Sequence, residues 1–211
     1  MEATAGEQSW TVDEIGVTIV RVHDERHAKG AEQVLRRLIA RLSGVPADDV
    51  ELDRRCGQCG ARHGAPTVEY PTPPSGGRWH ADVASADGIV VAATGTRHPL
   101  GVAVEAAGPL GRTIDEAAFH ASELARLDTV VEAERAALRT TMWARKAALA
   151  RALGHRSFLE PARIELTSPL EDDGAARLVR AVPELGAAWR RVVVHDVPGA
   201  DGLAAAVAVL G

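Results

Sequence analysis

Hydrophobic positions in the first third of the chain change from a strand pattern to a helical one. Residues 16–23 (GVTIVRVH) are rich in β-branched side chains and predict a strand. Residues 28–42 follow and place apolar side chains at helical spacing, namely Val34, Leu35, Leu38, Ile39 and Leu42. Gly44 is a plausible end for this helix. This part therefore predicts a strand followed by a helix.

The longest helical pattern covers residues 128–153. Apolar positions recur there at alternating seven- and four-residue steps, at Val131, Leu138, Met142, Leu149 and Leu153. Gly154 follows as a normal C-terminal stop. Trp143, Ala147 and Arg151 are each four residues from the next and form the neighbouring row. The apolar stripe predicts core packing, and the neighbouring row is where we expect chemistry.

The other patterned segments predict short strands and one further helix. Residues 79–94 and 98–105 indicate two strands, which we expect to form a hairpin closed around residues 95–97. Residues 115–127 predict a helix with Phe119 and Leu124 facing inward. Three more strands are expected near the end of the chain, at residues 162–166, 189–195 and 203–210.

The order of these elements indicates the fold class. Both halves run strand, helix, then strands, and this order predicts an α+β protein and is compatible with two similar lobes. We place an N-terminal lobe at residues 1–107 and a C-terminal lobe at residues 108–211, within one compact unit.

Composition narrows the function classes. The 211 residues are 46% apolar, which is enough for a sizeable core. The net charge is −5, and basic residues are interleaved with acidic ones, so a nucleic-acid-binding surface is not indicated. The longest apolar runs, residues 88–94 and 203–210, are too short to cross a bilayer, and residues 1–8 do not form a signal peptide. We expect a soluble cytoplasmic protein without membrane contact.

The two cysteines lie close together and call for a local interpretation. Cys56 and Cys59, with His63 beyond them, resemble half of a zinc knuckle, because thiolates and imidazole are good zinc ligands. Three ligands are one fewer than a structural site needs, so a closed site would require His23, His80 or another distant group. A tight turn holding buried thiols is the simpler interpretation, and we do not expect zinc.

Four segments, taken in order and with their spacing, resemble a known family. They are CGQCGARHGAP, GIVVAATGTRHPLGVAVE, a helix containing FHASEL, and WARKAALARALG. Together they are similar to the Sfp-type 4′-phosphopantetheinyl transferases over roughly residues 30–166. The resemblance implies Mg²⁺-dependent transfer of phosphopantetheine from coenzyme A to a serine of an acyl or peptidyl carrier protein, often in secondary metabolism. It also implies a pseudo-twofold pair of lobes, each with a three-stranded antiparallel sheet packed on a long helix, and a site between the lobes.

The resemblance implies three metal-binding carboxylates, and this chain retains one. Magnesium takes oxygen ligands, and the family supplies an Asp and a Glu from a strand and a second Glu from a helix. The strand motif here is GVAVE, so Ala103 stands at the Asp position and Glu105 remains as the metal ligand. The helix motif is WARKA, so Ala147 stands at the helical Glu position.

Other positions carry over with varying fidelity. Lys146 persists, and Arg151 stands where a phosphate-binding lysine is expected. Gly64 begins the turn that helps to hold coenzyme A, without the family's lysine after it, and Ser85 lies in the segment that would contact the nucleotide. Glu123 matches a family glutamate proposed as a general base. The resemblance therefore implies catalytic roles for Glu123 and Lys146 and coenzyme A contacts for Gly64, Ser85 and Arg151.

The departures share one character, since the lost residues are those that would touch metal or nucleotide. A lone carboxylate holds Mg²⁺ poorly against its hydration shell, and removing a charge-stabilising group costs about 3–4 kcal/mol of transition-state stabilisation. We therefore expect lost or much reduced transfer. The alternatives are a non-catalytic scaffold that keeps a carrier-protein surface and a cleft that serves other small-molecule chemistry. His80, Asp82 and Asp87 are either replacement ligands near this cleft or ordinary polar residues of a loop.

Overall fold

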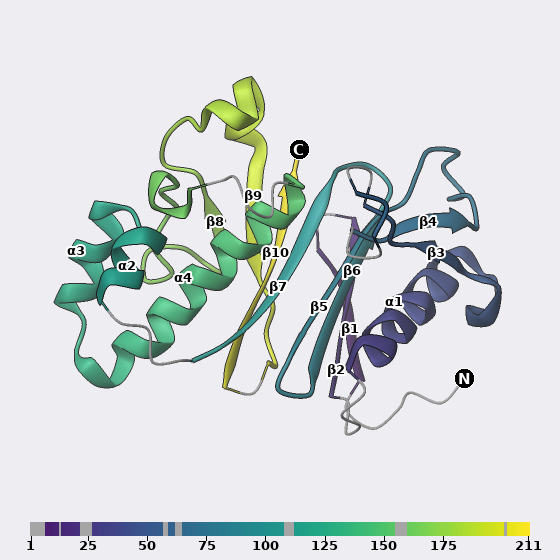
Figure 1. Ribbon diagram of the computed structural model, residues 1–211, viewed down its shortest axis with the longest axis horizontal. Helices are drawn as coiled ribbons and strands as arrows, with labels where there is room; N and C mark the ends of the chain where they lie inside the picture. The colour runs from purple at the N-terminus through teal and green to yellow at the C-terminus, as the bar shows by residue number, and fades with distance from the viewer. Residues whose placement is uncertain are drawn as a thin grey trace.

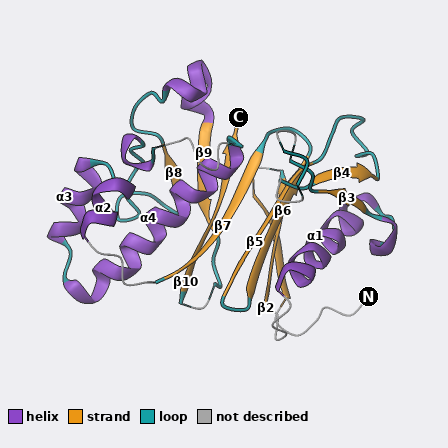
Figure 2. Cartoon of the chain, viewed as in Figure 1, coloured by secondary structure: helices purple, strands orange, loops and turns teal. Residues whose placement is uncertain are grey.

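The computed structural model describes residues 7–12, 14–21, 27–56, 59–61, 65–107, 112–154, 160–200 and 202–211. Over these residues the chain forms two four-stranded antiparallel sheets, one two-stranded sheet and several helices (Figure 1; Figure 2). The α+β fold class expected from the sequence is confirmed.

The first sheet has the order β1-β2-β6-β5. Its strands are β1 (Glu7–Val12), β2 (Ile15–Arg21), β5 (His80–Ala86) and β6 (Ile89–Gly95). Side chains of successive residues in a strand point to opposite faces, so this sheet buries two apolar sets. One face carries Val20, Val83 and Val90 against α1 (His27–Ser43). The helix ends at Gly44, whose φ of 81° is readily adopted by glycine, as the sequence predicted.

The second sheet has the order β7-β10-β9-β8. Its strands are β7 (Leu100–Ala106), β8 (Ala175–Arg177), β9 (Val192–Asp196) and β10 (Leu203–Leu210). The long helix α4 (Glu132–Ala152) packs on one face of this sheet, where Ala144, Ala148 and Leu149 meet Ala206 and Val194. Gly154 follows the helix with φ of 72°, as predicted.

The remaining faces of the two sheets pack against each other. Ile19, Ile89 and Val91 of the first sheet share one buried cluster with Val104 and Val207 of the second. The layers are therefore α1, first sheet, second sheet and α4, an arrangement visible from one side of Figure 1 to the other. Each sheet has four strands rather than the three implied by the family resemblance.

Short elements complete the described fold. They are the two-stranded sheet of β3 (Glu51–Asp53) and β4 (Thr67–Tyr70), the helices α2 (Arg112–Ala118) and α3 (Ala121–Thr129), and the 3₁₀ segments η1 (Ala47–Asp49), η2 (Pro161–Arg163) and η3 (Pro183–Arg191). The helix predicted over residues 115–127 is thus two helices, broken where His120 caps the start of α3. The strand predicted at residues 162–166 was also wrong, because it begins in η2 and contributes only an isolated bridge at Leu166.

The hairpin predicted around residues 95–97 was wrong as well. β6 pairs with β2 and β5, whereas the next strand, β7, pairs with β10 in the other sheet. The actual hairpin joins β5 to β6 through Asp87 and Gly88, both with positive φ. β7 precedes the division that we placed after residue 107, yet it hydrogen bonds with a strand from the end of the chain. β5 and β7 are each an edge strand of their own sheet, and they lie side by side in the middle of the molecule (Figure 1).

Candidate functional site

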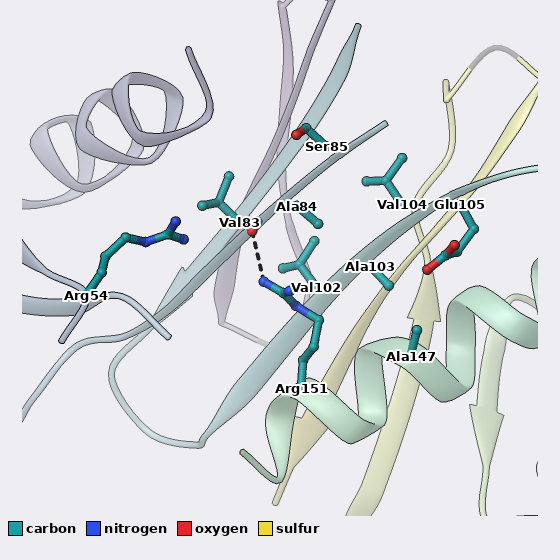
Figure 3. Close-up of a pocket in the computed structure, with 10 residues that line it drawn as sticks. All are labelled: Arg54, Val83, Ala84, Ser85, Val102, Ala103, Val104, Glu105, Ala147 and Arg151. Atoms are coloured by element: carbon teal, nitrogen blue, oxygen red, sulfur yellow. Dashed lines mark hydrogen bonds between the residues drawn. The ribbon is translucent and has the colours of Figure 1, made fainter. Parts of the chain in front are cut away.

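A pocket of about 300 Å³ lies where β5, β7 and α4 meet (Figure 3). Ten residues line it: Arg54, Val83, Ala84, Ser85, Val102, Ala103, Val104, Glu105, Ala147 and Arg151. They come from the loop after β3, from both sheets and from α4. The pocket therefore depends on the packing of the two sheets and not on any single segment.

The three positions at which the family resemblance places metal ligands line this one pocket. Ala103 and Glu105 are two residues apart on β7, and Ala147 faces them from α4. Close packing of β7 on α4 makes this possible, because Gly101 brings the two backbones together. A Cβ on Gly101 would lie 2.2 Å from the backbone nitrogen of Ala152. The glycine of the GVAVE motif thus sets the distance between the strand and the helix.

Glu105 is a partly buried carboxyl in this pocket. Burial raises its pKa above the usual glutamate value, and a hydrogen bond with the Trp143 side chain and the positive charge of Arg151 oppose the shift without cancelling it. Trp143 packs edge-on against Phe119, with 6.5 Å between ring centroids. The tryptophan of the WARKA motif therefore orients the carboxyl that the sequence singled out as a metal ligand.

Arg151 lines the pocket but is already engaged with Asp82. Its Nε donates to Oδ2 of Asp82 at 2.7 Å, and its Nη2 donates to Oδ1 at 2.5 Å and to the carbonyl of Val83 at 2.9 Å. The same Oδ2 accepts the backbone N–H of Val102 at 2.9 Å. Asp82 therefore clamps β5, β7 and α4 together. It is a buried strand residue with every oxygen partnered, not a loop residue or an open metal ligand.

Arg54 is the pocket residue that the sequence interpretation missed. It follows β3, and Figure 3 shows its side chain extending toward the region of Arg151. Its neighbour Arg55 forms an ion pair with Asp53, with 2.7 Å between Nε of Arg55 and Oδ2 of Asp53. Within the described part of the chain, no hydrogen bond or ion pair involves the Arg54 guanidinium. The RR pair was visible in the sequence, but nothing in its pattern indicated which arginine would reach the pocket.

Lys146 and Glu123 lie together in a buried site of their own. The Lys146 ammonium is 2.6 Å from Glu123 and donates to the carbonyls of Pro161 and Ile164, each at 2.7 Å. Glu123 also accepts the backbone N–H groups of His120 and Leu166. Burial lowers the pKa of Lys146 below the usual lysine value, although Glu123 opposes the shift. In the described structure neither side chain borders the pocket of Glu105, and both hold α3 and α4 against the segment that follows η2.

The remaining predicted site residues are placed as follows. Ser85 is exposed on β5 and lines the pocket. Gly64 and His63 lie outside the described residues. Cys59 is exposed and Cys56 is half-buried, so the interpretation of the pair as buried thiols was wrong for Cys59. Among the described residues no cluster of three His, Cys, Asp or Glu side chains could hold a metal ion.

A second hollow of about 270 Å³ adjoins the pocket along α4. The two share Ala147 and Arg151. The other residues that line this hollow are Trp143, Lys146, Ala150, Pro161 and Ile164. Its lining is mainly apolar, in contrast to the polar groups around Arg54 and Glu105. In the row predicted from the sequence, Trp143 borders this hollow, and Ala147 and Arg151 border both the hollow and the pocket.

Comparisons with known proteins identify no family for this chain. No protein-family model matches the chain, and no curated protein matches it. Within the ranges that the structure describes, none of the helices is long and apolar enough to cross a membrane.

Proposed function

We propose that this chain is a relative of the Sfp-type 4′-phosphopantetheinyl transferases that keeps the cleft between its two sheets and has lost most or all Mg²⁺-dependent transfer. The observation that carries the proposal is the meeting of Ala103, Glu105 and Ala147 in one pocket. Those positions come from a strand and a helix about forty residues apart, and the family resemblance assigns all three to one metal site from the order of the motifs alone.

The surviving groups favour loss of transfer. Glu105 is the one carboxylate of the three, and the fourth candidate, Asp82, is occupied by Arg151 and the Val102 N–H. A single carboxylate competes poorly with the hydration shell of Mg²⁺. Lys146 and Glu123 are bound to each other, so the groups that would contact phosphate and take the serine proton are engaged in holding the fold.

The expected result is that the purified chain transfers no phosphopantetheine. Several acyl and peptidyl carrier proteins would be incubated with coenzyme A, the chain and Mg²⁺ or Mn²⁺, and their intact masses measured. An active transferase serves as the positive control for each carrier. Without a bound metal to stabilise the charge that develops on the leaving nucleotide, we expect no gain of the phosphopantetheine mass. A mass gain that depends on the chain would contradict the loss of transfer.

A cleft that serves different chemistry is the second candidate. The guanidinium of Arg54 favours it, because this group has no hydrogen-bond or ion-pair partner among the described residues and a cation in the pocket supplies a ligand contact that does not depend on metal. Calorimetry with coenzyme A separates the candidates from a functioning transferase, since tight binding that requires Mg²⁺ would be evidence for the inherited activity.

A further inference from the structure

Replacement of two carboxylates by alanine changes the charge balance of the pocket between β5, β7 and α4. With Asp at position 103 and Glu at position 147 the lining would be strongly acidic, and a phosphate could approach it only through a divalent ion. In this chain the positive charges of Arg54 and Arg151 balance the negative charges of Glu105 and of Asp82, which is hydrogen bonded to Arg151. Asp82 forms an ion pair with Arg151. The Arg54 guanidinium therefore has no counter-charge among the described residues.

The charged groups occupy different ends of the pocket. Arg54 and the Arg151 guanidinium lie toward one end, and Glu105 lies toward the other, with Val102 and Ala103 between them (Figure 3). Nε and Nη2 of Arg151 donate to Asp82 and Val83. The third nitrogen, Nη1, has no partner among the described residues. Guanidinium groups bind phosphate through paired N–H donors, so these two arginines define the end that an anion would occupy.

The apolar hollow beside the pocket fixes what else the ligand carries. From Arg151 the hollow extends over Ala147 to Ala150 and Pro161. Alanine at position 147 leaves this passage open, whereas a glutamate there would place a charge in it. Lys146 borders the hollow, but its ammonium is held by Glu123 and backbone carbonyls, so the passage offers mainly apolar contacts.

We infer that this pocket binds a phosphate monoester with an apolar arm directly through Arg54 and Arg151, without a divalent cation. The inference rests on the proposed function in taking the same cleft as the ligand site. It goes beyond that function because the carboxylate-held metal is replaced by direct guanidinium contacts. The phosphate lies at the arginine end, and the arm runs along α4 over Ala147 and Ala150.

The test measures binding of hexyl phosphate and methyl phosphate to the full chain by calorimetry in the presence of EDTA. Hexyl phosphate is expected to bind at least about tenfold more tightly than methyl phosphate, because the added methylene groups leave water. Arg54→Gln is expected to weaken binding of hexyl phosphate by about tenfold, the loss of a charge-assisted contact. Arg97→Gln removes the same charge from an arginine that is 70% exposed, paired with Glu14 and outside the pocket lining, and should change the affinity less than about twofold.

A third variant separates the arm from the phosphate. Ala150→Asp places a charge in the apolar hollow. It is expected to weaken the binding of hexyl phosphate and to leave the affinity for methyl phosphate unchanged. Equal weakening by Arg54→Gln and Arg97→Gln would reduce the effect to general electrostatics and overturn the inference. Binding that appears only when Mg²⁺ replaces EDTA would also overturn it while leaving the family relationship intact, and absence of binding in both buffers would overturn it outright. Phosphopantetheine transfer to a carrier would contradict the proposed function without deciding this result.

Discussion

Replacing Lys146 with methionine is expected to lower the free energy of unfolding by about 3–5 kcal/mol, because the change leaves the Glu123 carboxylate buried without its counter-charge. Both side chains are almost inaccessible, with relative exposures of 1% and 2%. The carbonyls of Pro161 and Ile164 also lose their donor. The same residue in a solvent-facing catalytic role would leave stability nearly unchanged, so this result distinguishes the structural role from the catalytic one.

Urea unfolding followed by circular dichroism measures the effect. Arg135→Met on the same helix is the matched control, because Arg135 is paired with the exposed Glu132 and its loss should cost less than about 1 kcal/mol. Adding Glu123→Gln to Lys146→Met should recover part of the stability, since the buried charge is then removed with its partner. Equal stability of Lys146→Met and the parent chain would refute the buried ion pair.

Gly101→Ala is expected to cost about 3 kcal/mol or more, as overpacking between rigid backbones does. The added Cβ would lie 2.2 Å from the Ala152 nitrogen and 2.4 Å from the Ala148 oxygen. Neither contact can be relieved by rotating a side chain. β7 must instead move away from α4, which would widen the pocket between Ala103 and Ala147.

Gly77→Ala is the control for this change, because its Cβ would meet nothing closer than 3.8 Å. Thermal or urea unfolding of the two variants should show a loss for Gly101→Ala and little change for Gly77→Ala. Similar stability of both variants would mean that β7 and α4 are farther apart than the structure places them.

Local patterns predicted the two long helices, α1 and α4. They did not predict which strands pair with one another. The periodicity of α1 and α4 is a property of consecutive residues, and glycine at positions 44 and 154 marks their ends, so both were predicted within a few residues. β7 has the same alternation whether it pairs with β6 or with β10, more than ninety residues later. Only the packing of both sheets selects the second partner.

The candidate site was predicted in part for the same reason. Motif order located Ala103, Glu105 and Ala147, which line the pocket, together with Ser85 and Arg151. The partners of Lys146 and Arg151 could not be inferred, because Glu123 and Asp82 reach them only after folding. Arg54 was missed because the sequence does not show that Asp53 pairs with Arg55, which leaves the Arg54 side chain to line the pocket.

Descent from a metal-dependent transferase, as proposed above, implies that the pocket would hold a divalent ion once carboxylates are restored at positions 103 and 147. Mn²⁺ would be titrated into the parent chain and into the Ala103→Asp/Ala147→Glu variant, with free Mn²⁺ followed by electron paramagnetic resonance. Ala125→Asp/Ala137→Glu adds the same charges at exposed helix positions and serves as the control. We predict a new Mn²⁺ site, at least about tenfold tighter than any in the parent or the control, in the restored variant alone. A folded restored variant that binds Mn²⁺ no better than the control would contradict it.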